Sequence, residues 1–184
     1  LYHDTRLSKD NTIACASCHV LSAGGVDGQP VSTGVGGAKG GVNAPTVYNA
    51  ALQIEQFWDG RAHTLEDQAA GPPTNPIEMA SSWPEIIGKL SADSAWMTRF
   101  LAVFPEGLSK ETITHAIAEF ERTLLTPQSP FDRYLLGESN AISAKAQEGH
   151  QLFMNIGCAN CHVGTTLGGQ SFELMGREGD YFAD

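Results

Sequence analysis

The sequence predicts an all-α protein with long glycine-rich loops and little β-strand. Apolar residues after Ser109 recur at alternating four- and three-residue steps, which is the period of one helix face. Several other segments begin with a Ser, Thr or Asp that can cap a helix, and end at a Gly or Pro. Glycine occupies eight of the 18 positions from Gly24 to Gly41, which is incompatible with regular structure there.

Three helices are expected in the middle of the chain, each with its own start and stop signal. The first is short, because a glycine and a proline follow its opening turn closely. The second opens on a capping box, Ser-Trp-Pro-Glu at 82–85, with proline in the first turn. The third carries Trp96, Phe100 and Phe104 on one side. The first of these helices is expected to start at Thr64 and stop at Gly71, and the second to start at Ser82 and stop at about Leu90. The third is expected to start at Asp93 or Ser94 and stop at Pro105.

The clearest helix follows Ser109, and Pro127 is expected to end it. Residues 126–131 contain two prolines and are expected to form an interdomain linker. Ser143 then caps a helix that Gly157 terminates, just before a cysteine-containing motif. The apolar residues are Ile113, Ile117, Phe120 and Leu124 in the first of these helices, and Leu152, Phe153 and Ile156 in the second.

All four cysteines fall in two copies of the pattern Cys-x-x-Cys-His, at 15–19 and 158–162. This is the attachment signature of c-type haem, because on a helical turn both thiols and the following imidazole share one face. A redox disulfide does not need the histidine, and a zinc site would need ligands that nothing else here is spaced to supply. The sequence therefore predicts two covalent haems, held by the thiols of Cys15, Cys18, Cys158 and Cys161 and by His19 and His162 as iron ligands.

The motifs divide the chain into two cytochrome c-like haem domains, 1–128 and 129–184. The net charge of −10 argues against a nucleic-acid or anionic-membrane partner, since both favour a basic surface. No apolar run approaches the roughly 18 residues of a membrane span. Haems of this type are attached outside the cytoplasm, so the expected compartment is the periplasm, with any export signal already removed.

Several further motifs accompany the first Cys-x-x-Cys-His in a characteristic order: Asn-Ala-Pro-Thr at 43–46, Phe-Trp-Asp-Gly-Arg within 56–61, Gln-Ala-Ala-Gly-Pro at 68–72 and Glu-Met at 78–79. In order and spacing they resemble the bacterial diheme cytochrome c peroxidases, and the resemblance continues to Met-Gly at 175–176. It implies reduction of hydrogen peroxide to water with electrons from a small cytochrome c or cupredoxin. The first haem would be the low-potential, peroxidatic one, and the second the high-potential, electron-transfer one.

Three residues acquire roles from the resemblance that they would not have alone. Glu78 matches the distal-pocket glutamate, a proton shuttle whose pKa the neighbouring Ile77 and Met79 are expected to raise; alone, it would be a surface carboxylate. Trp58 matches the tryptophan between the two haems; alone, it would be a core residue. Asn43 matches a ligand of the interdomain calcium ion, although one carboxamide does not establish such a site.

The sequence departs from the family's pattern at Val35, where most members have a histidine 16 positions after the iron-ligating one. That histidine blocks the iron in the resting enzyme, so here the pocket is expected to be open without activation, unless His63 substitutes. An open pocket also resembles the related diheme enzyme that matures the tryptophan tryptophylquinone of methylamine dehydrogenase. Protein oxidation is therefore the alternative function, and a non-catalytic diheme carrier or sensor is a third.

The C-terminal domain is expected to be incomplete, because the sequence ends 22 residues after His162. In the family, a later segment supplies the sixth ligand of the second haem, and Met175 is a weaker candidate for it. The resemblance also leads us to expect a homodimer. His3, His115 and His150 are expected to be structural or exposed.

Overall fold

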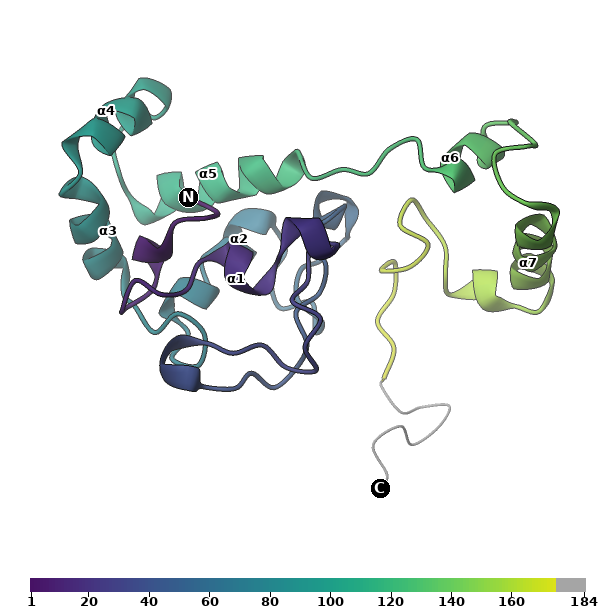
Figure 1. The fold of residues 1–184 in the computed structure, drawn as a ribbon, viewed down its shortest axis with the longest axis horizontal. Helices are drawn as coiled ribbons and strands as arrows, with labels where there is room; N and C mark the ends of the chain where they lie inside the picture. The colour runs from purple at the N-terminus through teal and green to yellow at the C-terminus, as the bar shows by residue number, and fades with distance from the viewer. Residues whose placement is uncertain (175–184) are drawn as a thin grey trace. The chain divides into compact units, whose positions relative to one another are not determined.

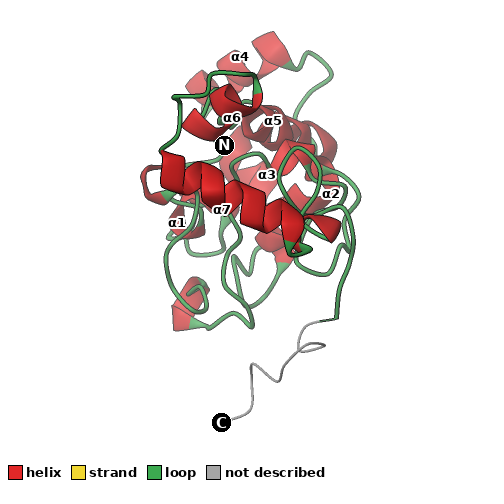
Figure 2. Ribbon diagram, turned by 90° about the vertical axis from the view of Figure 1, so that its right-hand side faces the viewer, coloured by secondary structure: helices red, strands yellow, loops and turns green. Residues whose placement is uncertain are grey.

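The computed structural model describes residues 1–174, and in this part the protein is helical, as expected (Figure 1). Extended pairing within it is limited to two isolated bridges, Thr33 with Lys39 and Gln56 with Ala62. Helices and loops accordingly account for what is drawn in Figure 2. The helices are α1 (Cys15–Cys18), α2 (Leu65–Ala69), α3 (Trp83–Ser91), α4 (Ser94–Val103), α5 (Lys110–Arg122), α6 (Pro130–Leu135) and α7 (Ala144–Asn155).

The caps expected for these helices are confirmed, with one difference. Thr64 Oγ1 accepts a hydrogen bond from Asp67 N at 3.0 Å, and Asp93 Oδ1 accepts one from Trp96 N at 2.9 Å. At α3, Ser82 Oγ accepts from Glu85 N at 3.4 Å. The Glu85 carboxylate does not return the bond to the cap but accepts from Ser81 Oγ at 3.1 Å, so only half of the expected capping box forms.

Two boundary predictions were wrong. Helix α5 ends at Arg122 rather than near Pro127, because the next backbone N–H groups no longer form four-residue helical bonds. Thr123 N donates to Phe120 O at 3.0 Å and Leu124 N donates to Glu121 O at 2.9 Å, each three residues back. The expected linker at 126–131 is shorter, because α6 begins at Pro130. Proline suits the first position of a helix, where its missing N–H has no intrahelical partner in any case.

The chain divides into two compact units, 1–51 with 56–125, and 52–55 with 126–184. In the first unit, α2, α3 and α5 surround an apolar core, and α2 packs along α5. In the second unit, none of the residues described up to 174 is buried. Within the described chain, no helix combines the length and apolarity needed to cross a membrane. The large buried side chains of this core include Leu7, Met79, Ile86, Leu90, Ile113 and Ile117.

Candidate functional site

The thiols of the first Cys-x-x-Cys-His motif lie on α1, one turn of helix. Ala14 precedes the helix, and its N–H donates to Ser17 Oγ at 3.0 Å, which holds the turn closed. Both thiols are partly buried, and burial raises the pKa of Cys15 to about 12 and raises that of Cys18 as well. Two thiols at this spacing, followed by a histidine, suit addition to the two vinyl groups of a haem.

The imidazole of His19 is oriented by a contact distant in sequence. Its Nδ1 lies 3.0 Å from the carbonyl oxygen of Pro45, so Nδ1 carries the proton and Nε2 keeps the lone pair that binds iron. Burial lowers the pKa of His19, which favours the neutral form needed for ligation. Tyr2 Oη donates to His19 O at 2.7 Å and fixes the backbone. The first unit thus fits a haem bound through residues 15–19.

The second motif repeats this arrangement. Gly157 has a left-handed conformation (φ 97°), which terminates α7 and opens a 3₁₀ turn at Cys158–Asn160. His162 N donates to Cys158 O at 3.0 Å, matching the 2.9 Å bond from His19 N to Cys15 O. His162 Nδ1 also lies 3.1 Å from a backbone carbonyl, that of Leu167. The residues of the second unit therefore fit a haem in the same way.

The loop around Val35 lies directly against the backbone of Glu78. Val35 N donates to Glu78 O at 2.8 Å, and a side chain on Gly34 would overlap the carbonyl oxygens of Ile77 and Glu78. Glycine is thus required at 34 for this close approach. The position that differs from the family's pattern is therefore adjacent to the expected proton shuttle, although 43 residues separate the two in sequence.

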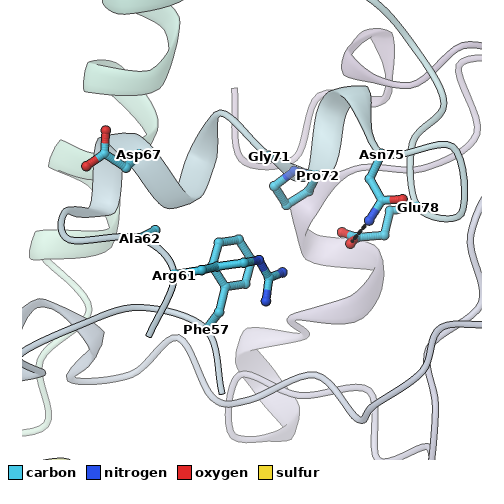
Figure 3. Close-up of a pocket in the computed structure, with 8 residues that line it drawn as sticks. All are labelled: Phe57, Arg61, Ala62, Asp67, Gly71, Pro72, Asn75 and Glu78. Carbon is cyan, nitrogen blue, oxygen red and sulfur yellow. Dashed lines mark hydrogen bonds between the residues drawn. The ribbon is translucent and has the colours of Figure 1, made fainter. Parts of the chain in front are cut away.

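Glu78 lies at one end of a cavity of about 300 Å³ (Figure 3). Its carboxylate is half-buried, and Oε1 accepts a hydrogen bond of 2.6 Å from Asn75 Nδ2. In this view Arg61 lies between Asp67 and Glu78, with its guanidinium 3.6 Å above the centre of the Phe57 ring. The lining residues are Phe57, Arg61, Ala62, Asp67, Gly71, Pro72, Asn75 and Glu78.

The expected apolar surroundings of Glu78 form only in part. Met79 is buried in the core at 2% exposure, but Ile77 is 46% exposed and points away from the core. The residue that contacts the carboxylate is Asn75, which the sequence analysis passed over. Its position three residues before Glu78 was the available signal, because an amide at that spacing in a turn can reach the carboxylate.

The structure places Trp58 at the surface, so its interpretation as a core residue was wrong. Its side chain is 60% exposed, and Nε1 donates to the backbone oxygen of Asn43 at 3.0 Å. This bond joins two residues that the sequence analysis had singled out separately. The Asn43 side chain is exposed, and its role toward calcium stays a prediction, as does the role of Trp58.

The remaining histidines of the described chain are not among the residues that line the cavity. His3, His63 and His115 are exposed, and His150 is half-buried against the rings of Phe131 and Tyr134. His115 shares a contact of 3.2 Å with Glu66. Met175 lies outside the described residues.

Comparisons with known proteins show which family the chain resembles in sequence. Residues 1–140 match the family model of di-haem cytochrome c peroxidase. The chain is 61% identical over 98% of its length to cytochrome c peroxidase Ccp of Escherichia coli K12, covering 39% of that protein. It is 47% identical over 96% of its length to cytochrome c551 peroxidase of Nitrosomonas europaea, covering 53% of it. The chain thus spans about half or less of these relatives.

The fold agrees with that of a solved structure. A MauG-like protein associated with microbial copper homeostasis superposes with a TM-score of 0.82 at 32% identity, over 94% of this chain and 54% of that one. Two haem-attachment motifs, a helical fold and a carboxylate-bearing cavity in the first unit are thus accompanied by similarity over nearly the whole chain. The chain belongs to the di-haem cytochrome c peroxidase family.

Proposed function

We propose that the protein containing this chain reduces hydrogen peroxide to water, using two electrons and two protons per molecule. The observation that carries this proposal is the Glu78 carboxylate, which faces a cavity next to the loop of Val35 in the unit that contains His19. The negative charge of Glu78 acts to raise the pKa of the His19 imidazole and that of the Cys18 thiol, although burial lowers the pKa of His19 overall. The names of the relatives in Escherichia coli and Nitrosomonas europaea support the same activity.

In this proposal the haem, when bound, supplies the redox chemistry, and the protein supplies proton transfer and position. The Nδ1–H of His19 donates a hydrogen bond to Pro45 O, which leaves Nε2 to bind the iron. Glu78 accepts a proton from one peroxide oxygen and delivers it to the other, so that the leaving oxygen departs as water. Val35 has no atom that could bind iron, so it would not occupy the iron's open coordination position.

The remaining parts of the proposal concern the protein beyond this cavity. Residues 1–128 form the peroxidatic domain, and 129–184 belong to the electron-transfer domain. Trp58 assists electron transfer between the haems, and Asn43 is one ligand of a calcium ion. The electrons come from a small cytochrome c or cupredoxin in the periplasm, and the protein is a homodimer.

Protein oxidation is the second candidate function. Val35, in place of the family's histidine, and the likeness to a MauG-like protein both favour it. The identity of 32% to that protein is well below the 61% to a cytochrome c peroxidase, so peroxide reduction is better supported.

The test is peroxide turnover by the holoprotein carrying Glu78→Gln, which keeps the shape of the side chain but cannot shuttle the proton. We expect a fall of about 10²-fold or more, the usual scale for loss of general acid–base catalysis. Glu106→Gln, at an exposed glutamate in a loop of the same unit, is the matched control and should keep full activity. Near-normal turnover in Glu78→Gln would show that the assignment is wrong.

A further inference from the structure

We propose that Asn75 is a positioning residue, which holds the Glu78 carboxylate so that one oxygen is bound and the other faces the cavity. This inference rests on the proposed function, because it concerns the group that would move the proton. Asn75 and Glu78 line the same end of the cavity, and the bond between them is drawn in Figure 3.

The orientation of the Asn75 amide follows from its two contacts. Its Oδ1 accepts from Ile77 N at 3.0 Å, and its Nδ2 donates to Glu78 Oε1 at 2.6 Å. A flipped amide would place its NH₂ against the Ile77 N–H and its oxygen against the carboxylate, losing both bonds. Pro76 has no N–H, so Ile77 provides the first backbone donor that the asparagine oxygen can use. The donor is therefore directed at the carboxylate.

The backbone that carries Asn75 and Glu78 is held by hydrogen bonds on both sides. Asn75 N donates to the carbonyl oxygens of Gly71 and Pro72, each at 3.2 Å. Asn75 O in turn accepts from Glu78 N at 3.1 Å and from Ala80 N at 2.9 Å. The bond from Val35 N to Glu78 O holds the segment from the other side. With the backbone fixed, the rotation of the Glu78 side chain is the freedom that remains, and Asn75 restricts it.

The chemical consequence concerns the orientation in which the carboxylate meets its substrate. Because Oε1 is bound by the Asn75 amide, the carboxylate is held in one orientation. In this arrangement the other oxygen, Oε2, is the one that accepts the proton. Holding a catalytic group in place contributes to rate, since a displacement of about 1 Å can cost about 10²-fold.

The test compares two substitutions of Asn75 in the holoprotein. Asn75→Ala removes the tether, and we expect kcat to fall about 10-fold with a smaller change in KM. Asn75→Asp keeps the acceptor for Ile77 N but places a second carboxylate against Glu78. Two like charges at this distance favour protonation of one of them. As the pH is lowered, this variant should therefore lose activity at a higher pH than the unaltered protein does. Thr74→Ala, in the same turn but outside the cavity lining, is the matched control.

A second measurement, infrared spectroscopy, does not depend on catalytic turnover. The infrared carboxyl band that disappears in Glu78→Gln is followed through a pH titration, and its midpoint should move upward in Asn75→Asp. If both Asn75 variants match Thr74→Ala in kcat, pH profile and infrared midpoint, the positioning role is refuted while the function of Glu78 stands. If instead Glu78→Gln retains turnover, the proposed function fails, and the role of Asn75 with it.

Discussion

Glu121 is a carboxyl group inside the core of the first unit, and its burial predicts an unusual dependence of stability on pH. It lies on α5 with 5% of its surface exposed. Burial raises its pKa from 4.5 to about 7, the charge of Glu66 adds to the effect, and Arg122 opposes it. Because the folded state binds this proton more tightly than the unfolded state, the stabilisation is complete below about pH 4.5 and is lost as pH rises through about 7.

The magnitude follows from the two pKa values. Each tenfold difference in proton affinity is worth about 1.4 kcal/mol, so a pKa raised from 4.5 to about 7 corresponds to about 3 kcal/mol. Glu121→Gln keeps the size of the side chain and removes the charge at every pH. The free energy of unfolding of this variant, relative to that of the unaltered protein, should therefore rise by about 2.5 kcal/mol between pH 5 and pH 8, because a small part of the effect is already lost below pH 5.

Urea unfolding of the holoprotein at several pH values, followed by circular dichroism, measures this difference. Taking the difference between the two proteins removes the groups that titrate alike in both. Glu106→Gln, at an exposed glutamate, should show a difference that does not change with pH. A pH-independent difference for Glu121→Gln as well would refute the reasoning, because it would mean that Glu121 ionises normally in the folded state.

Two further predictions concern the haem motifs and the glycine-rich loop. Replacing Cys158 and Cys161 by alanine should leave one covalent haem per chain in mass spectrometry of the denatured protein, and loss of both haems would contradict independent attachment. The oxidised holoprotein should show a high-spin haem in electron paramagnetic resonance, because Val35 offers no donor atom. Val35→His should convert that signal to low spin, since the loop already reaches the Glu78 backbone; a spectrum with only low-spin haem in the unaltered protein would contradict the open cavity.

Local features of the chain were predictable from sequence. The helices at 65–69, 83–91, 94–103 and 144–155 begin where a capping side chain satisfies free N–H groups within three residues. The haem motifs are equally local, because two thiols and an imidazole within five residues share one helical turn. The irregular loop followed from its glycines. In each case the interacting groups lie within a few positions of one another in the sequence, so residue type and spacing are enough to predict the local structure.

The tertiary structure alone determined the contacts between groups that lie far apart in sequence or belong to the backbone. The contact that orients His19 comes from the Pro45 carbonyl, 26 positions away, and every residue type carries such a carbonyl. The approach of Val35 to Glu78 depends equally on a backbone pair. The exposure of Trp58 and the burial of Glu121 reverse what residue type alone suggests. Burial is set by how distant segments pack, so sequence located the haem motifs, but only the packed chain determined the surroundings of Glu78.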